Sequence, residues 1–405
     1  MKRFFLLFTI VFFFLEIYLY QAVRTITSSA LLRGLYIGIS LSVYLYLFYQ
    51  YFLFSQKSLS ALQLQIIVTL FLALLMPKLL IAVYLLIDDV LRLGEFSFRS
   101  LHPTAEVFYP ERRKLLSYLG IGSAAILSGL FLDGVINGKY RHRVRKVKLK
   151  FKNLPKEFQG YRIVQISDLH SGSFLHPQKL RPAFELINAQ KPDLILFTGD
   201  AVNNLASEFE PFKVFFQSLR AKDGLYSVLG NHDYGQYHQW NSKEEEIENL
   251  ERLIRDQKEA GLDLLRNENR EIKRENASIY LLGVENWGEK PFPQLGDLDL
   301  ASKGVSPESF KVLMSHDPTH FDYVVESHPS NVQLTLSGHT HGMQFGLDLK
   351  NFKWSPVQFR YKKWADLYQV GSKYLYVNRG FGVIGYPGRV GINPEITLFE
   401  LSRSE

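Results

Sequence analysis

The chain has 405 residues, a formal net charge of +7 and no cysteine. The absence of cysteine excludes disulfides, thiolate metal sites and cysteine nucleophiles. A chain of this length exceeds one ordinary hydrophobic core, so at least two regions are expected. Hydrophobic residues make up 46% of the chain and are concentrated in its first third. This asymmetry indicates a membrane region followed by a soluble domain.

Four apolar segments within residues 1–137 predict a membrane region with about four transmembrane helices. They run over 4–23, 34–54, 62–87 and 115–137. Each reaches the length of about 20 residues that spans a bilayer. The first segment follows Lys2 and Arg3 and lacks a small-x-small cleavage site, which favours an uncleaved anchor over a signal peptide. The result is a multi-pass integral membrane protein.

The third segment is interrupted by Pro77 and Lys78. A kinked helix accommodates this pair, with the lysine facing other helices or water. Two interpretations of Lys78 stay open: a functional group inside the membrane, or a helix end whose side chain reaches the interface.

The side of the membrane that carries the soluble domain also has two interpretations. Lys2 and Arg3 place the N-terminus inside, and four spans return the chain to that side. The contrary signal is Arg112 and Arg113, a pair that resembles a twin-arginine export signal. We expect the cytoplasmic side, with the extracytoplasmic side as the alternative.

A basic juxtamembrane segment follows at 138–152, with eight Lys and Arg residues and no acid. Its lysines alternate with Val147, Leu149 and Phe151, which predicts an edge strand with a solvated face. Contact with anionic lipid headgroups is compatible with the same pattern. Nucleic-acid binding is not expected, because no recognition helix or base-stacking pattern accompanies the charge.

The third region, 153–405, alternates apolar runs with helical stretches, including a charged surface helix over 241–260. Five apolar runs stop on polar residues. The endings contain Asp168 and His170, then Asp200, then Asn231, His232 and Asp233, then His316, and finally His339 and His341. Glycine directly precedes Asp200, Asn231 and His339, where a tight turn would bring backbone close to a ligand. Polar loops at the ends of sheet strands are typical of a binding site.

These endings offer seven possible metal ligands made of carboxylate, amide and imidazole groups. They are Asp168, His170, Asp200, Asn231, His316, His339 and His341. Ligands of this kind suit Mn, Fe or Zn, and seven suit two ions that share a carboxylate. Two such ions clamp an in-line displacement at phosphorus and acidify a bridging water. His232 and Asp233 are then the catalytic candidates, with the His232 imidazole protonating the departing alkoxide.

The order Asp-x-His, Gly-Asp, Gly-Asn-His-Asp, His, Gly-His-x-His over residues 150–402 resembles the calcineurin-like metallophosphoesterases. The resemblance implies a β-sandwich flanked by helices and two divalent metal ions. It assigns Asp168, His170 and His341 to the first ion, Asn231, His316 and His339 to the second, Asp200 to both, and the general acid to His232. The third block ends in Asp233, where many relatives carry Glu.

The whole chain resembles the membrane-anchored bacterial branch of this family, which includes phosphodiesterases and pyrophosphatases acting on UDP-diacylglucosamine. The resemblance implies a phosphodiester or pyrophosphate substrate, which we expect to be lipid-linked, in the bacterial inner membrane. Arg379 and Arg389 are candidates for the pocket wall, because guanidinium matches phosphate oxygens. The alternative function is a membrane sensor or transporter with a regulatory phosphoesterase domain, which Lys78 alone favours.

Overall fold

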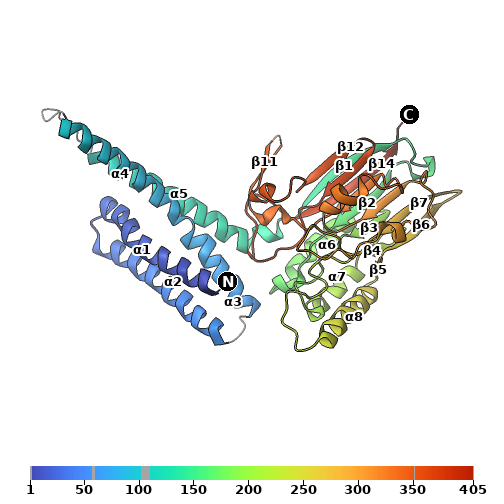
Figure 1. Ribbon diagram of the computed structural model, residues 1–405, viewed down its shortest axis with the longest axis horizontal. Coiled ribbons are helices and arrows are strands. Elements are labelled where there is room, and N and C mark those ends of the chain that lie inside the picture. Colours follow the sequence, from blue (N-terminus) through green and yellow to red (C-terminus); the bar gives the residue numbers. More distant parts are fainter. Residues whose placement is uncertain (1, 57–59, 102–109, 351, 405) are drawn as a thin grey trace. The chain divides into compact units, whose positions relative to one another are not determined.

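The computed structural model describes residues 2–56, 60–101, 110–350 and 352–404 (Figure 1). The chain divides into two compact units. One comprises residues 1–136 together with 385–387, and the other comprises 137–384 together with 388–405. After the roles that the sequence predicts for them, we call them the membrane unit and the catalytic unit.

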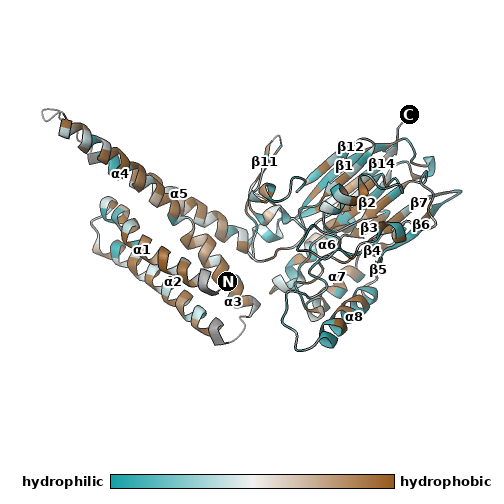
Figure 2. Ribbon diagram, in the orientation of Figure 1, coloured by the Kyte–Doolittle hydropathy of each residue, from teal (hydrophilic) through white to brown (hydrophobic). Residues whose placement is uncertain are grey.

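The membrane unit is built of helices joined by short connections. Its elements are α1 (Lys2–Ile26), α2 (Ala30–Gln56), α3 (Ala61–Leu70), the π-helical turn η1 (Phe71–Leu75), α4 (Lys78–Leu101) and α5 (Pro110–Ile136). Four helical stretches in the described chain are long and apolar enough to cross a membrane, namely Thr9–Ile26, Ala30–Leu53, Leu62–Phe98 and Glu111–Ile136. Figure 2, coloured by residue hydropathy, shows that hydrophobic residues predominate in these helices. The prediction of four spans is confirmed, and the break before α4 lies at Pro77, which cannot donate a helical hydrogen bond.

Lys78 lies half-buried against α1 and α2 inside the membrane unit. Its Nζ lies 2.8 Å from Oε1 of Glu16 and donates to Oγ of Ser40 at 2.9 Å. The hydroxyl of Tyr44 donates to the other Glu16 oxygen at 2.9 Å. Lys78 is therefore an ion-paired group within the helix packing.

A second charged cluster joins α4 to α5. Arg112 Nε lies 2.9 Å from Asp88 Oδ1, and Arg113 Nη1 lies 2.8 Å from Asp89 Oδ1. The Asp88 side chain is 1% exposed, so its charge is neutralised within the protein. The two arginines thus pair with acids on the preceding helix.

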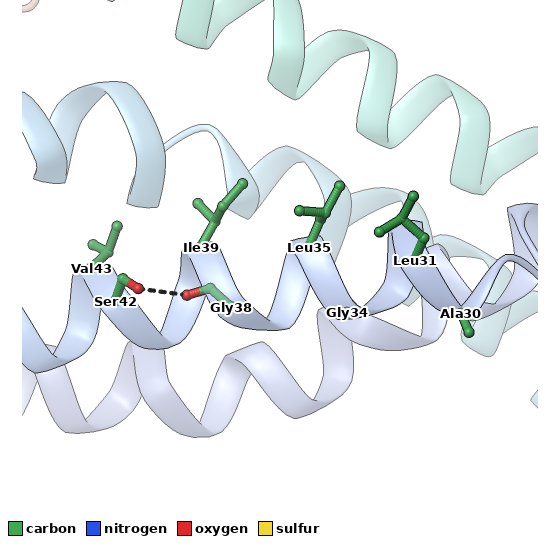
Figure 3. A pocket seen from close by; sticks show the side chains of 8 residues that line it. All are labelled: Ala30, Leu31, Gly34, Leu35, Gly38, Ile39, Ser42 and Val43. Carbon is green, nitrogen blue, oxygen red and sulfur yellow. Dashed lines mark hydrogen bonds between the residues drawn. The ribbon is translucent and has the colours of Figure 1, made fainter.

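One face of α2 carries a shallow cavity of about 630 Å³ (Figure 3). It is lined by the small residues Ala30, Gly34, Gly38 and Ser42 and by the larger Leu31, Leu35, Ile39 and Val43. A Cβ added at Gly34 or Gly38 would meet nothing within 4 Å in the described protein. Small residues four apart leave room for close approach of another hydrocarbon surface.

The catalytic unit contains two six-stranded sheets. The first has the strand order β1-β14-β2-β3-β4-β5 and the second has the order β12-β13-β9-β8-β7-β6. The first sheet uses β1 (Arg143–Phe151), β2 (Tyr161–Ile166), β3 (Leu194–Phe197), β4 (Leu225–Ser227), β5 (Asp263–Leu264) and β14 (Glu395–Arg403). The second uses β6 (Glu268–Arg274), β7 (Ala277–Gly283), β8 (Lys311–Met314), β9 (Leu334–Ser337), β12 (Asp366–Val370) and β13 (Lys373–Val377).

Neighbouring residues of β2 show how the layers are stacked. Ile163 lies in a core shared with Val312 and Leu336 of the second sheet. Val164 instead lies in a core with Phe184 on α6, as the two-residue alternation of a strand requires. The outer helices are α6 (Arg181–Ala189), α7 (Lys213–Gln217) and α8 (Lys243–Glu259). The short α9 (Leu298–Ala301) follows later, between β7 and β8 in the chain. The predicted β-sandwich flanked by helices is confirmed.

Parallel pairing brings the ends of the strands together. β2, β3 and β4 are parallel neighbours in the first sheet, and β8 and β9 are parallel neighbours in the second. The polar endings predicted from the sequence follow these five strands, so they emerge at the same edge of their sheets.

β1 is the edge strand of the first sheet, and its side chains alternate between exposed and buried towards its end. Lys146, Lys148 and Lys150 are exposed, whereas Leu149 and Phe151 are buried. The edge-strand interpretation of the basic segment is therefore confirmed.

Candidate metal centre

The five loops bring all seven predicted ligand residues together. Asp168, His170 and His341 form one group, and Asp200, His316 and His339 form a second. Within each group the candidate ligand atoms lie within 4.8 Å of one another. Asn231 joins the second group, because its Oδ1 lies 2.9 Å from Nδ1 of His339.

Asp200 lies between the two groups. Its Oδ2 is 3.4 Å from Nε2 of His170 and 3.1 Å from Nε2 of His316. Its Oδ1 accepts the backbone N–H of His232 at 2.9 Å. One oxygen is thus fixed by the backbone, while the other faces an imidazole of each group.

The backbone at the site is held in an unusual conformation. Asp168, His170, Asp200, His339 and His341 all have positive φ, between 48° and 71°. The left-handed region costs a residue other than glycine about 1–2 kcal/mol. Such strain persists where surrounding structure imposes it and is typical of functional sites. Glycine would relieve the strain but would supply no ligand atom.

Two glycines are required because ligand carboxylates occupy the space that a side chain would fill. A Cβ on Gly230 would lie 2.2 Å from Oδ1 of Asp200. A Cβ on Gly338 would lie 2.2 Å from Oδ2 of Asp168. Glycine before Asn231 and before His339 therefore allows the close approach that the sequence pattern predicted.

Burial sets the charge of most imidazoles at the site. It lowers the pKa of His170, His339 and His341, so these rings are held neutral, the form that binds metals. Burial alone would raise the pKa of the Asp200 carboxyl, but the neighbouring His316 and His232 hold it well below its usual range. His316 behaves differently, because the Asp200 charge overcomes burial and raises its pKa to about 10.

The side chains fit two divalent ions. The Nε2 atoms of His170, His316 and His341 are buried and find no hydrogen-bond partner in the part of the chain that the structure describes. Leaving such atoms unsatisfied is costly unless they serve as ligands. Nδ1 of His316 donates to the carbonyl of Thr198 at 2.7 Å, which directs its Nε2 towards Asp200.

His232 lies beside the first group, with its ring centroid 4.9 Å from that of His170. Its Nδ1 is 2.8 Å from the carbonyl of Asn203. Because a carbonyl only accepts, Nδ1 carries the proton of that bond, and Nε2 is left to exchange protons.

Asp233 is fully buried and faces the backbone of the loops. Its two oxygens accept the N–H groups of Asp200, Ala201, Val202 and Gly230 at 2.8–3.2 Å. It therefore binds the loop after β3 to the loop after β4, and so holds Asp200 near Asn231.

The interpretation of Arg379 as a pocket residue is wrong. Its side chain is 0% exposed, and it pairs with Asp366 at 2.7 Å and with Glu395 at 2.8 Å. Carboxylates 13 and 16 residues away in the sequence thus accept from its Nη2 and Nη1 groups. Arg389 is also buried, and its Nη2 lies 3.3 Å from Nδ1 of His341, behind the ligand group.

Three further contacts were not predicted from the sequence. The hydroxyl of Tyr361 lies 2.7 Å from Nε2 of His339, and the ring of Phe292 packs edge-on against the same imidazole. Asn231 Nδ2 donates to the hydroxyl of Tyr237 at 2.9 Å. Tyr237, four residues after Asp233, could have been found by its proximity in sequence. Tyr361 and Phe292 come from loops without a motif.

Two family models match the chain. Residues 2–139 match "Probable Calcineurin-like phosphoesterase, transmembrane domain", and residues 161–343 match "Calcineurin-like phosphoesterase". The chain is 30% identical over 262 residues to the uncharacterized metallophosphoesterase YkuE of Bacillus subtilis, which covers 62% of this chain and 83% of that protein.

Two other relatives match more of this chain. A transmembrane protein with metallophosphoesterase domain from Danio rerio is 26% identical over 313 residues, covering 72% of this chain and 68% of that protein. An uncharacterized metallophosphoesterase of Helicobacter pylori (strain J99) is 28% identical over 298 residues, covering 73% of each. The chain belongs to the calcineurin-like metallophosphoesterase family, as a membrane-anchored hydrolase of phosphoric ester bonds with two candidate metal sites.

Proposed function

We propose that the protein is a dinuclear phosphoesterase that hydrolyses a phosphodiester or pyrophosphate bond by in-line attack. The observation that carries this proposal is the position of Asp200, whose Oδ2 faces an imidazole of each ligand group. One shared carboxylate between two nitrogen-rich groups is the arrangement that two neighbouring cations require.

The proposed ligands follow the two groups. Asp168, His170 and His341 hold one ion, Asn231, His316 and His339 hold the other, and Asp200 contacts both. Mn, Fe or Zn suits these oxygen and nitrogen donors. When bound, such a pair lowers the pKa of the attacking water and offsets negative charge on the phosphoryl oxygens.

His232 is the proposed general acid. The carbonyl of Asn203 accepts the Nδ1 proton and orients the ring. The imidazolium form would therefore deliver its Nε2 proton to the leaving oxygen, and Nε2 would then take a new proton from water. Asp233 supports this chemistry by holding the two loops together. Its four backbone partners place Asp200 and the residues after Gly230 in one rigid arrangement.

A lipid-linked phosphoester is the proposed substrate, and the membrane unit supports it because an anchored enzyme meets such substrates at the bilayer. The bacterial inner membrane, with the catalytic unit on the cytoplasmic side, is the proposed location. Lys2 and Arg3 favour that side. Arg112 and Arg113, the contrary signal, pair with acids on α4, which supports a structural role for them.

The test uses full-length protein in nanodiscs with Mn²⁺. Asp200→Asn is expected to lower hydrolysis of bis(p-nitrophenyl) phosphate about 10³-fold, because both ions lose a ligand. His232→Ala is expected to lose more activity on an alkyl phosphodiester than on the nitrophenyl ester, because a poor leaving group needs the proton. His176→Ala, at an exposed histidine outside the site, is the matched control.

Full activity of Asp200→Asn would overturn the dinuclear assignment. Equal losses on both esters for His232→Ala would remove the general-acid role. A parallel screen of lipid and soluble phosphoesters decides the substrate class, since a lipid-linked substrate requires the higher kcat/KM on lipid esters.

A further inference from the structure

The hairpin of β10 (Leu347–Leu349) and β11 (Phe352–Trp354) has two chemically different faces. In its antiparallel register Leu347 lies opposite Trp354, Asp348 opposite Lys353, and Leu349 opposite Phe352. Because side chains alternate along a strand and opposite residues share a face, one face is apolar and the other charged. The hairpin stands apart from the two six-stranded sheets (Figure 1).

The apolar face is open to solvent. Leu347, Leu349 and Phe352 are 51%, 63% and 55% exposed. Five of the thirteen large exposed hydrophobic side chains found among the described residues of the catalytic unit fall within 343–359. Such a concentration in one short segment marks an interaction surface, because isolated exposed apolar residues are common but clusters are not.

The charged face is tied to the catalytic unit by ion pairs. Asp348 pairs with Arg145 of β1, and with Nε of Arg379 at 3.3 Å. Lys353 Nζ lies 3.1 Å from Asp366 Oδ2. A two-stranded hairpin is only marginally stable alone, so these contacts hold its charged side inward and its apolar side outward.

A cavity of about 740 Å³ lies between the hairpin and the start of β1. It is lined by Arg143, Val144, Arg145, Asp348, Leu349, Lys350, Phe352, Lys353 and Asp366. Its two carboxylates pair with Arg145, Lys353 and Arg379. By contrast, Arg143 and Lys350 are exposed and form no ion pair with any residue that the structure describes. The cavity therefore presents two available cations beside exposed apolar side chains.

A short connection joins the last membrane helix to β1. Six residues separate Ile136, where α5 ends, from Arg143, where β1 begins. At most about 3.3–3.6 Å per residue, this connection holds Arg143 within about 25 Å of the end of α5. A surface that combines cations with exposed Leu and Phe matches the headgroup and acyl boundary of an anionic bilayer.

We propose that the β10–β11 hairpin is an interfacial anchor, whose apolar face enters the bilayer surface while Arg143 and Lys350 bind phosphates of anionic phospholipids. The anchor fixes the orientation of the catalytic unit on the membrane. This role does not depend on the metal centre or on the identity of the substrate.

The absence of native cysteine makes the test direct. Full-length Phe352→Cys is labelled with an environment-sensitive fluorophore and placed in nanodiscs of phosphatidylcholine alone or with phosphatidylglycerol. Asn276→Cys, at the exposed turn of the β6–β7 hairpin, is the matched control. We expect the label at 352, and not the label at 276, to shift to shorter wavelength when phosphatidylglycerol is present.

Adding Arg143→Gln and Lys350→Gln to the labelled protein is expected to lower the inserted fraction, relative to the free fraction, on the order of tenfold. Emission at 352 that matches 276 in both lipid mixtures would overturn the proposal. An effect of inorganic phosphate in detergent, without dependence on bilayer charge, would show a soluble phosphate site instead and also overturn it. The lipid comparison needs no cation variant, so it decides the question even where the double variant folds poorly.

Discussion

The two units each bury a cluster of charged side chains, but the clusters are satisfied in opposite ways. In the membrane unit, Lys78 and Glu16 neutralise each other, and Ser40 and Tyr44 complete their hydrogen bonds. In the catalytic unit, four nitrogens of the ligand imidazoles His170, His316 and His341 remain without a hydrogen-bond partner in the described structure. Five ligand residues there also have positive φ. A self-contained cluster stabilises a fold, whereas an incompletely satisfied and strained one is prepared for a ligand.

This difference bears on the sensor or transporter alternative, which depended on Lys78 alone. A lysine whose partners are all supplied by neighbouring helices has the properties of a packing element. The buried charge with unsatisfied groups lies at the metal centre, so the comparison favours an enzyme whose membrane unit is an anchor.

The largest effect is expected when the membrane pair is broken on one side. Lys78→Met leaves Glu16 buried without its cation, which is expected to cost about 3–5 kcal/mol in stability. SDS titration of the detergent-solubilised protein measures the loss. The double variant Lys78→Met with Glu16→Gln is expected to recover most of it. No recovery in the double variant would show that Lys78 acts through other contacts.

The next effect concerns geometry at the metal centre. Gly230→Ala places a Cβ against Oδ1 of Asp200 and displaces the shared carboxylate. A misplacement of about 1 Å is expected to lower activity about 10²-fold. Gly304→Ala, at a left-handed glycine with open space around it, is the control and is expected to keep activity. Comparable losses in both variants would mean that the effect is one of general stability.

A smaller effect is expected on metal affinity as pH changes. Asp200 raises the pKa of His316 to about 10, so in the metal-free protein this ring is protonated at neutral pH. An ion that binds His316 must displace the proton from this ring. The affinity for that ion therefore rises with pH, by up to about tenfold per pH unit below pH 10. Calorimetry with Mn²⁺ in buffers of different ionisation enthalpy measures the released proton. A Mn²⁺ affinity that does not change with pH would contradict the pairing of His316 with Asp200.

The smallest effect is expected at Tyr361. Tyr361→Phe removes the hydroxyl that lies 2.7 Å from Nε2 of His339. Loss of one orienting hydrogen bond is expected to weaken metal binding by about 1 kcal/mol, or about fivefold. Tyr323→Phe, at an exposed tyrosine on the helical turn η8 (Phe321–Val325), serves as control. Unchanged Mn²⁺ affinity in Tyr361→Phe would show that the hydroxyl does not orient His339 and that the tyrosine contributes only packing.

The meeting of the ligand residues at one site could be predicted, because polar residues directly after an apolar run mark the end of a strand in the local sequence. A buried run such as Leu194–Phe197 stops on polar residues, and parallel pairing then places its ending beside the others. The same reasoning gave the four membrane spans, since length and composition are local properties. Strands with mixed polarity were missed, among them β6 with its sequence ENREIKR, and the three-residue strands β10 and β11.

Long-range pairings could not be predicted. Glu16 lies 62 positions before Lys78 in the sequence, and nothing local links them. Arg379 was interpreted as a phosphate ligand because its chemistry permits it. Its partner Asp366 is brought near it by the β12–β13 hairpin, and Glu395 becomes a neighbour only when β14 of the other sheet is in place. Composition identifies the available groups, whereas packing decides which of them remain free.

The position of β14 has a consequence for how the protein is made. It lies between β1 and β2, and its register joins Arg143 to Glu395, 252 positions apart. Pairings of such high sequence separation form slowly. During synthesis the membrane helices can associate while β1 and the apolar β2 still lack their shared neighbour. During this interval the exposed lysines of β1 disfavour pairing between the strands of different nascent chains, because charged side chains discourage edge-to-edge association.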